Sequence, residues 1–160
     1  MTGDDVKYAQ RVLTKALAEM EKFVGLKEEP PRSNHVPEIN SWWGGGDVAW
    51  CARIVSKAYI LAGSRAFVRG RNYEYVPTLV GDARAGRNGL TVTLNPQPGD
   101  LVCFDWDGTN FHTGKNHVGM FKSGTAGRFK TIQGNFGDCC DYQNRTTGSA
   151  PHVVFVHVGK

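Results

Sequence analysis

The stretch PQPGDLVCFDW, residues 96–106, decides the fold class, because the chain changes character there. Its prolines and glycine favour a turn, and the residues that follow are apolar, β-branched or aromatic, as in a strand. Three similar runs come after it, NHVGMFK at 116–122, GRFKTIQG at 127–134 and HVVFVHVG at 152–159. Turn-forming residues separate these runs. We therefore predict a small antiparallel β-sheet in the second half of the chain.

The first half has a helical pattern instead. Residues 4–24 place apolar side chains three and four positions apart, and Gly25 is a suitable stop. A second apolar stripe begins after Asp47, which we take as the N-cap, and ends at Gly63. Helices followed by strands predict an α+β domain with N-terminal helices packed on the sheet. We expect a long ordered loop before Asp47, an irregular excursion with a short helix at 64–89, and one domain over residues 1–160.

Composition narrows the class of partner. The net charge is +4, the basic residues are scattered, and no motif for reading bases is present, so we expect no nucleic-acid partner. Positive charge also suits an anionic wall polymer. No apolar run reaches the roughly 18 residues of a membrane span, and the start, MTGDDVKYAQ, does not read as a signal peptide. We expect no membrane insertion and a monomer.

The four cysteines predict free thiols, because no CxxC pair exists and nothing indicates an oxidising compartment. We expect no metal site and no other cofactor. Cys51 is the candidate nucleophile, since it lies about one turn inside the start of the second helix, where the helix dipole stabilises a thiolate. The competing interpretation is structural: Cys51 shares the apolar stripe of that helix, and buried cysteine behaves as a small hydrophobe.

Among five histidines, His117 is the candidate base. It opens a predicted strand, which would hold it rigidly at the sheet edge, and Gly119 leaves room for close approach. His112 is the nearest rival but lies in a polar loop, TNFHTG. A base needs an orienting partner. Strand alternation places Gln133 and Asn135 on one face, and either amide oxygen can accept from the imidazole.

Four short motifs stand in a familiar order: WCARIVS at 50–56, PGDLV at 98–102, HVG at 117–119 and TIQGN at 131–135. Together they resemble the CHAP domains of peptidoglycan hydrolases, over residues 9–158. The segment from Gly25 through SN at 33–34 to WWG at 42–44 resembles the CHAP domains of bacteriophage endolysins. The resemblance implies a papain-like fold of the NlpC/P60 type.

The resemblance also implies roles for individual residues. Cys51 would be the nucleophile and His117 the base. Many family members have a glutamate where this chain has Gln133, so the third residue is either Gln133 or Asn135; we favour Asn135, which keeps the family pattern. The lost carboxylate would lower activity. Four residues are expected to contact the substrate: Trp50, Trp43, Trp42 and Asn34.

The function so implied is cleavage of a wall amide bond, either between muramic acid and L-alanine or within the stem or cross-bridge peptide. We expect bacterial peptidoglycan as the partner, and the host cytoplasm as the location before release to the wall, as for a phage lysin. Two alternatives stay open. One is an NlpC/P60-type D,L-endopeptidase, whose usual Asp-Cys-Ser-Gly motif is missing at residues 49–52. The other is a non-catalytic wall-binding or virion module of the same fold.

Overall fold

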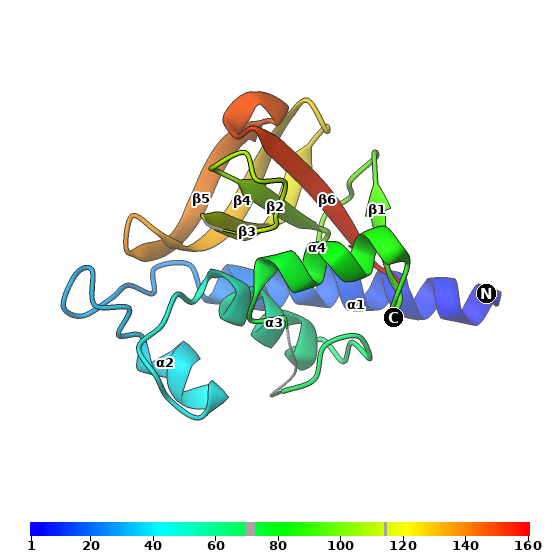
Figure 1. Ribbon diagram of the computed structural model, residues 1–160. Coiled ribbons are helices and arrows are strands. Elements are labelled where there is room, and N and C mark those ends of the chain that lie inside the picture. The colour runs from blue at the N-terminus through cyan, green and yellow to red at the C-terminus, as the bar shows by residue number, and fades with distance from the viewer. Residues whose placement is uncertain (70–72, 114) are drawn as a thin grey trace.

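The computed structural model describes residues 1–69, 73–113 and 115–160, and within them six antiparallel strands form one sheet (Figure 1). Their order across the sheet is β1-β6-β2-β3-β4-β5. The last strand of the chain therefore lies inside the sheet, between β1 and β2. The bounds are β1 (Leu90–Thr93), β2 (Leu101–Asp105), β3 (Asn116–Gly124), β4 (Arg128–Phe136), β5 (Cys139–Thr146) and β6 (His152–Val158).

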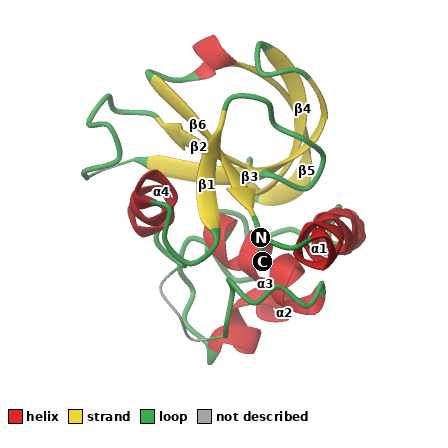
Figure 2. Ribbon diagram, turned by 90° about the vertical axis from the view of Figure 1, so that its right-hand side faces the viewer, coloured by secondary structure: helices red, strands yellow, loops and turns green. Residues whose placement is uncertain are grey.

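The helices gather on one side of this sheet, which curls strongly away from them (Figure 2). The predicted α+β fold, with N-terminal helices on an antiparallel sheet, is confirmed. In the described residues none of the helices is long and apolar enough to cross a membrane. The helices are α1 (Gly3–Lys22), α2 (Pro37–Asn40), α3 (Cys51–Leu61) and α4 (Val76–Ala85), with 3₁₀ turns η1 (Ser41–Trp43) and η2 (Thr147–Ser149).

Helix α1 follows the predicted apolar stripe and is closed at its start by a capping box. The hydroxyl of Thr2 accepts from the backbone N–H of Asp5, and the Asp5 carboxylate accepts from the backbone N–H of Thr2. Such a pair satisfies N–H groups that have no partner inside the helix. The helix ends at Phe23, and Gly25 takes a positive φ of 99° as the chain turns away.

The sheet has an apolar core on each face. All five residues of β2 are buried, and they alternate between the two cores. Leu101 and Cys103 join the larger core under α1, α3 and α4, whereas Val102 and Phe104 join a smaller core on the other face. A central strand buried on both faces reads as a continuous apolar run, which is why LVCFD lacks polar alternation.

Helix α3 begins three residues later than expected, with Trp50 rather than Asp47 at the N-cap. Asp47 is not its N-cap: the Asp47 carboxylate instead lies 3.0 Å from Nδ1 of His35. The backbone before α3 is irregular, with positive φ at Gly44, Gly45 and Gly46, and Trp50 occupies the cap position without a side-chain hydrogen bond. Cys51 is therefore the first residue of the helix rather than one turn inside it.

The segments between the main helices and strands contain short elements of their own. The long loop before α3 contains α2 and η1, and the excursion at 64–89 contains α4, although residues 70–72 lie outside the described part. Strands β1 and β5 escaped prediction, because they are short or polar and have an exposed face. The four cysteines are free, as predicted.

Candidate active site

Cys51 lies where the start of α3 meets β3, with only 7% of the residue exposed. Burial raises the pKa of its thiol, and hydrogen bonds from the backbone N–H groups of Val118, Ala52 and Cys51 itself act in the opposite direction. The first N–H groups of a helix have no partner within it, so they are available to a thiolate or an oxyanion. Burial outweighs them, and the resting thiol is neutral.

His117 is the second residue of β3 and pairs with Phe104 of β2. Its imidazole is buried among aromatic rings, with centroids 6.2 Å from Phe104, 6.3 Å from Trp106 and 6.1 Å from Phe136. Burial and the positive charge of Arg145 lower the pKa of His117 to about 4, while the Gln133 amide acts against them. The imidazole is therefore neutral at neutral pH.

The structure brings Cys51 and His117 to the same strand but does not join them. The thiol receives a hydrogen bond from the backbone of Val118, the neighbour of His117. Val118 packs with α3, and by strand alternation His117 faces the other way, with Phe104. No hydrogen bond connects the thiol to the imidazole in the part of the chain that the structure describes. Catalytic hydrogen bonds are often long without substrate.

Gln133 of β4 is fully buried beside the imidazole of His117. Glycine at 119 makes this possible, because a Cβ there would stand 2.6 Å from Cγ of Gln133. The expectation that Gln133 and Asn135 share one face through strand alternation is wrong, because a bulge lies between Gln133 and Phe136 and Asn135 has a positive φ of 56°. Gln133 lies against His117. The role of Asn135 as the orienting residue stays a prediction.

Arg145 of β5 is the residue of this site that the sequence did not reveal. Its Nη2 donates to Oε1 of Gln133 over 3.2 Å. Its guanidinium lies over three rings, 4.4 Å from the centroid of Phe136 and 5.7 Å from those of Phe104 and Trp106. Only the pairing of β5 with β4 places it there, and β5 was not predicted.

Trp50, which we expected to contact substrate, is buried inside the fold. Its side chain is 0% exposed, and its indole Nε1 donates to the buried carboxylate of Glu28 over 3.0 Å. Gly134 lets the indole reach the sheet, since a Cβ there would stand 2.9 Å from a Trp50 ring atom and 2.6 Å from Ile54. Trp50 therefore fixes the start of α3 against β4, and with it the position of Cys51.

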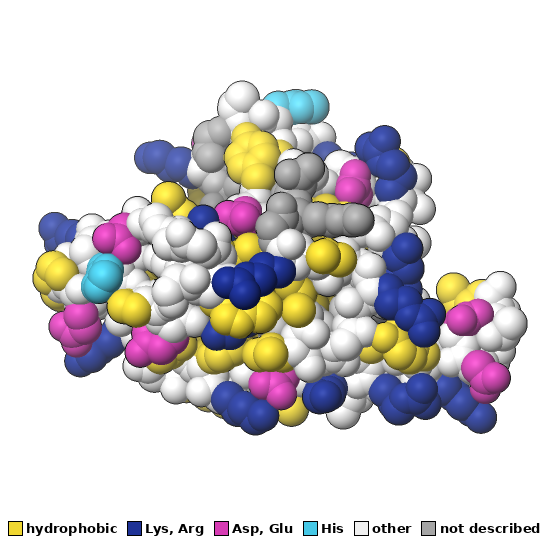
Figure 3. Space-filling model, turned by 90° about the horizontal axis from the view of Figure 1, so that it is seen from below, with side chains coloured by type: hydrophobic (Ala, Val, Ile, Leu, Met, Phe, Trp, Pro, Cys, Tyr) yellow, Lys and Arg dark blue, Asp and Glu magenta, His cyan; other side chains and the backbone are white. Residues whose placement is uncertain are grey.

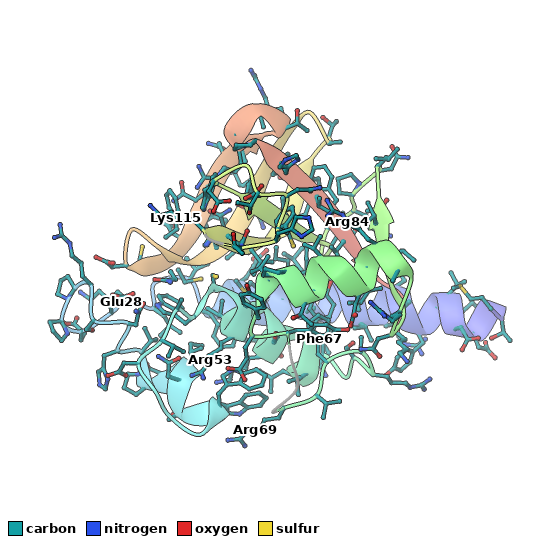
Figure 4. The ribbon with its side chains drawn as sticks, viewed as in Figure 1. Glu28, Arg53, Phe67, Arg69, Arg84 and Lys115 are labelled. Carbon is teal, nitrogen blue, oxygen red and sulfur yellow. The ribbon has the colours of Figure 1, made fainter. Side chains whose placement is uncertain are left out.

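Trp42 and Trp43 belong to η1, a turn that lies on the side of α3 away from the sheet (Figure 1). The two rings pack edge to face at 5.6 Å, and Trp42 lies 5.0 Å from the guanidinium of Arg69 and 5.3 Å from Nζ of Lys57. Figure 4 places Arg69 below α3, and Figure 3 shows Lys and Arg side chains lying over apolar ones on that face. The structure does not bring Trp42 to Cys51.

The loop that precedes Cys51 is held by Arg53, which lies between α2 and α3 (Figure 4). Its Nη1 donates to the carbonyls of Gly45 and Gly46 and to Oδ1 of Asn40, and its Nε donates to Glu74. Asn34, the fourth expected substrate contact, accepts at its backbone oxygen from Asn40. This network fixes the loop, and Asn34 belongs to it through its backbone.

No group of three His, Cys, Asp or Glu side chains in the described residues could hold a metal ion. The polar groups at the start of α3 and β3 are instead a thiol, an imidazole, an amide and a guanidinium. A cysteine that opens a helix packed on an antiparallel sheet, next to a strand that carries a histidine, is consistent with a papain-like domain.

The chain belongs to the CHAP family: the CHAP domain model matches residues 43–135, more than half of the sequence. CHAP domains are in general cysteine- and histidine-dependent amidases or peptidases that act on peptidoglycan. The matched range holds Cys51, His117, Gln133 and Asn135, and ends before Arg145. A comparison with curated proteins finds no match.

Proposed function

We propose that this protein hydrolyses an amide bond of bacterial peptidoglycan through a covalent thioester on Cys51. The observation that carries the proposal is the position of this thiol. It is the first side chain of α3, with backbone N–H groups directed at it, and it lies against the strand of His117. Membership of the CHAP family supplies the class of substrate.

In the proposed reaction, the thiolate of Cys51 attacks the carbonyl carbon of the scissile amide. The backbone N–H of Cys51, at the helix start, stabilises the negative charge that develops on the carbonyl oxygen. His117 takes the thiol proton and passes it to the leaving amine, and the C–N bond breaks to give the thioester. His117 then takes a proton from water, whose oxygen attacks the thioester and releases the acid and the thiol.

The proposed reaction requires the imidazole of His117 to approach the thiol of Cys51 more closely than in the resting protein. His117 is near the end of its strand, and we propose that its side chain rotates there toward Cys51 when substrate binds. Substrate that enters between α3 and the start of β3 would exclude water there. Water exclusion strengthens the interaction between thiolate and imidazolium.

We also propose a lysin role, in which the domain reaches the wall after accumulating in the host cytoplasm. The net charge of +4 supports attraction to the anionic polymers of the wall. The products of digestion identify the amide bond that is cleaved, and so distinguish a muramoyl-L-alanine amidase from a stem or cross-bridge endopeptidase.

The test is digestion of purified peptidoglycan with the protein and with Cys51→Ala. The parent protein should release muropeptides with new amine termini, and mass spectrometry of these products names the bond. Cys139→Ala is the matched control, since it removes a different thiol and should retain activity. Equal release by Cys51→Ala and the parent protein would refute the thioester mechanism.

A second candidate is a wall-binding module without catalysis. The neutral thiol and neutral imidazole of the resting protein favour it, as does the absence of a carboxylate beside His117 among the residues that the structure describes. This candidate predicts that the protein co-sediments with peptidoglycan and releases no product from it, whether or not Cys51 is present.

A further inference from the structure

The solvent side of α1 carries a row of three cations. Lys7, Arg11 and Lys15 follow one another at intervals of four residues, so they lie on one face of the helix, about 6 Å apart along its axis. All three residues are exposed, and Figure 3 shows Lys and Arg side chains spaced along the edge of the molecule that α1 forms. The apolar stripe of α1 is buried in the core, so the row faces away from the protein.

A shallow groove of about 470 Å³ lies among these cations. It is lined by six residues from this one side of α1, which we call the basic face: Lys7, Gln10, Arg11, Thr14, Lys15 and Ala18. None of the six is acidic, and the uncharged ones are polar or small. A groove that has cations and no carboxylate on its walls favours an anionic ligand.

The charge of the basic face is not balanced within the described residues, where no carboxylate forms an ion pair with it. Asp4, one turn before the row, is not paired with it. The acidic side chains further along α1 have other partners, since Glu19 pairs with Lys22 and Glu21 with Lys122. Like charges four residues apart destabilise a helix. The row therefore has a cost that a ligand of opposite charge would offset.

Tyr8 joins the row to a fourth cation, in the loop after α3. The guanidinium of Arg65 lies 4.3 Å from the ring centroid of Tyr8, and that of Arg11 lies 5.9 Å from the same centroid. The hydroxyl of Tyr8 donates to the backbone carbonyl of Gly63, which fixes the ring. Arg65 is thus held beside the row by an aromatic ring.

We propose that the basic face of α1 binds a phosphodiester polymer of the bacterial wall, of the polyol phosphate class. The inference rests on the proposed function, because the wall is where the substrate lies. One short polyol separates neighbouring phosphates in such a polymer, so a single extended chain presents anions to Lys7, Arg11 and Lys15 together. A membrane surface is also anionic, but the apolar residues of α1 that would enter a bilayer are buried in the core.

The basic face and the thiol lie at opposite ends of α3. Tyr8 contacts Gly63, just past the last residue of that helix, whereas Cys51 is its first residue. Eleven residues of helix separate these ends by about 15 Å. Bound polymer consequently leaves the start of α3 open to peptidoglycan. Two contacts with one wall also raise the effective concentration of substrate at the thiol.

Co-sedimentation tests the proposal with wall sacculi that retain their phosphodiester polymer, and with the same sacculi after hydrofluoric acid, which cleaves phosphodiesters and leaves peptidoglycan. The protein carries Cys51→Ala, so that the walls are not digested. Acid treatment should weaken binding at least about tenfold, as expected when a few phosphate contacts are lost. Raised salt should weaken binding to the untreated sacculi.

The combined variant Lys7→Gln, Arg11→Gln and Lys15→Gln should lose the same binding to untreated sacculi and lose little more after acid treatment. Glutamine has a helix propensity close to that of lysine and arginine, so we expect this variant to fold. Should it not fold, Arg11→Gln alone should give a smaller loss of the same kind. The exchange Lys7→Arg, Arg11→Lys and Lys15→Arg keeps the charge and should keep the binding.

The matched control combines Arg32→Gln, Arg87→Gln and Arg128→Gln, which remove the same charge from three exposed positions outside α1. It should retain most of the binding. Equal binding before and after acid treatment would overturn the proposal, and so would equal losses in the basic-face variant and the control. Binding to anionic lipid vesicles as tight as to untreated sacculi would also overturn it, and would make a membrane the partner.

Digestion of acid-treated peptidoglycan separates this proposal from the proposed hydrolase. With Cys51 present, the basic-face variant should keep the parent kcat/KM there, because no polymer remains. If neither protein digests peptidoglycan while the variant still loses binding to the polymer, the basic face stands and the hydrolase fails. If both digest it and both bind untreated sacculi equally, the hydrolase stands and the basic face fails.

Discussion

The side chain of Gln133 rests directly on the backbone of Gly119, in the neighbouring strand. A Cβ on Gly119 would stand 2.6 Å from Cγ of Gln133 and 3.2 Å from the carbonyl oxygen of Ile132. Neither neighbour can yield easily, since one is a buried stem and the other is backbone. The site beside His117 therefore depends on a residue that contributes no side chain.

Gly119→Ala should displace Gln133 from His117 and from Arg145. We expect a loss of about 1–3 kcal/mol in the free energy of unfolding, as for other overpacked cores, together with altered peptidoglycan cleavage. Denaturant unfolding and wall digestion measure the two effects. Gly148→Ala is the control, because its Cβ would meet only the Thr146 hydroxyl, at 3.6 Å. Equal stability of the two variants would contradict this account.

Arg53→Met should destabilise the protein through the loop before Cys51. It removes the donors to the carbonyls of Gly45 and Gly46, and leaves Oδ1 of buried Asn40 unpaired. The loss of the ion pair with the partly exposed Glu74 costs less free energy than the loss at Asn40, because water replaces the guanidinium beside that carboxylate. We expect a loss of about 2–3 kcal/mol, measured by denaturant unfolding.

The exposed ion pair of Arg87 with Asp82 offers the comparison for Arg53. Its N–O distance is 3.2 Å, and the Arg87 side chain is 68% exposed. Arg87→Met should cost less than about 1 kcal/mol. A similar cost for both arginines would mean that the Arg53 network adds no more than a surface pair.

The pair formed by His157 and buried Asp100 should make stability depend on pH. Nδ1 of His157 lies 2.8 Å from Oδ1 of Asp100, and this hydrogen bond raises the pKa of His157. Because the pKa of His157 is higher in the folded than in the unfolded state, the pair stabilises the fold fully at pH values below the unfolded-state pKa of about 6.5. This stabilisation is lost as the pH rises through the folded-state pKa.

The free energy of unfolding of the parent protein should therefore exceed that of His157→Gln by more at about pH 6 than at about pH 9. Denaturant unfolding at both pH values measures the difference. His112→Gln is the control, in a loop where no carboxylate partner is recorded for the histidine among the described residues. A gap between parent and His157→Gln that does not change with pH would show that the ion pair contributes nothing.

The resting thiol of Cys51 should react slowly with iodoacetamide at neutral pH and faster as pH rises. Burial raises the pKa of this thiol, and His117, with a pKa of about 4, supplies no charge to lower it. The thiolate is the reactive species. Peptide mass spectrometry after timed alkylation gives the rate at each pH. Cys139, which is less buried, provides the internal comparison.

A fast alkylation rate at Cys51 that stays constant from about pH 5 to about pH 8 would instead indicate a thiolate–imidazolium pair.

The elements that the sequence predicted are those whose burial is periodic. Apolar spacing located α1 and α3, and the continuous apolar run of β2 located the core of the sheet. Strand β5, CCDYQNRT, has too little apolar character to be recognised, because only its pairing with β4 makes it a strand. The start of α3 was misplaced, since Asp47 has the right chemistry for a cap but is used by His35.

At the site, position along the chain identified Cys51, His117 and Gln133 as candidates, and the structure places them around one end of β3. Asn135 was favoured over Gln133 because it keeps the family pattern. The bulge between Gln133 and Phe136 interrupts the strand alternation that was expected to place both residues on one face, and the sequence does not indicate this bulge. Trp50 was assigned to substrate because it precedes the nucleophile, but a buried hydrogen bond to Glu28 uses it inside the fold. Arg145 was missed because it reaches the site only through β5, and the local sequence of β5 does not indicate a strand.

The position of β6 has a consequence for how this protein is made. Its register pairs Val156 with Leu101 on one side and with Val92 on the other, so β1 cannot join the sheet until residues 152–158 are present. A chain still emerging from the ribosome would expose the flanking edges of β1 and β2, together with the apolar residues on both faces of β2. The native six-stranded sheet would thus form only after residues 152–158 have been synthesised, and a nascent chain stalled after residue 150 would be a substrate for chaperones.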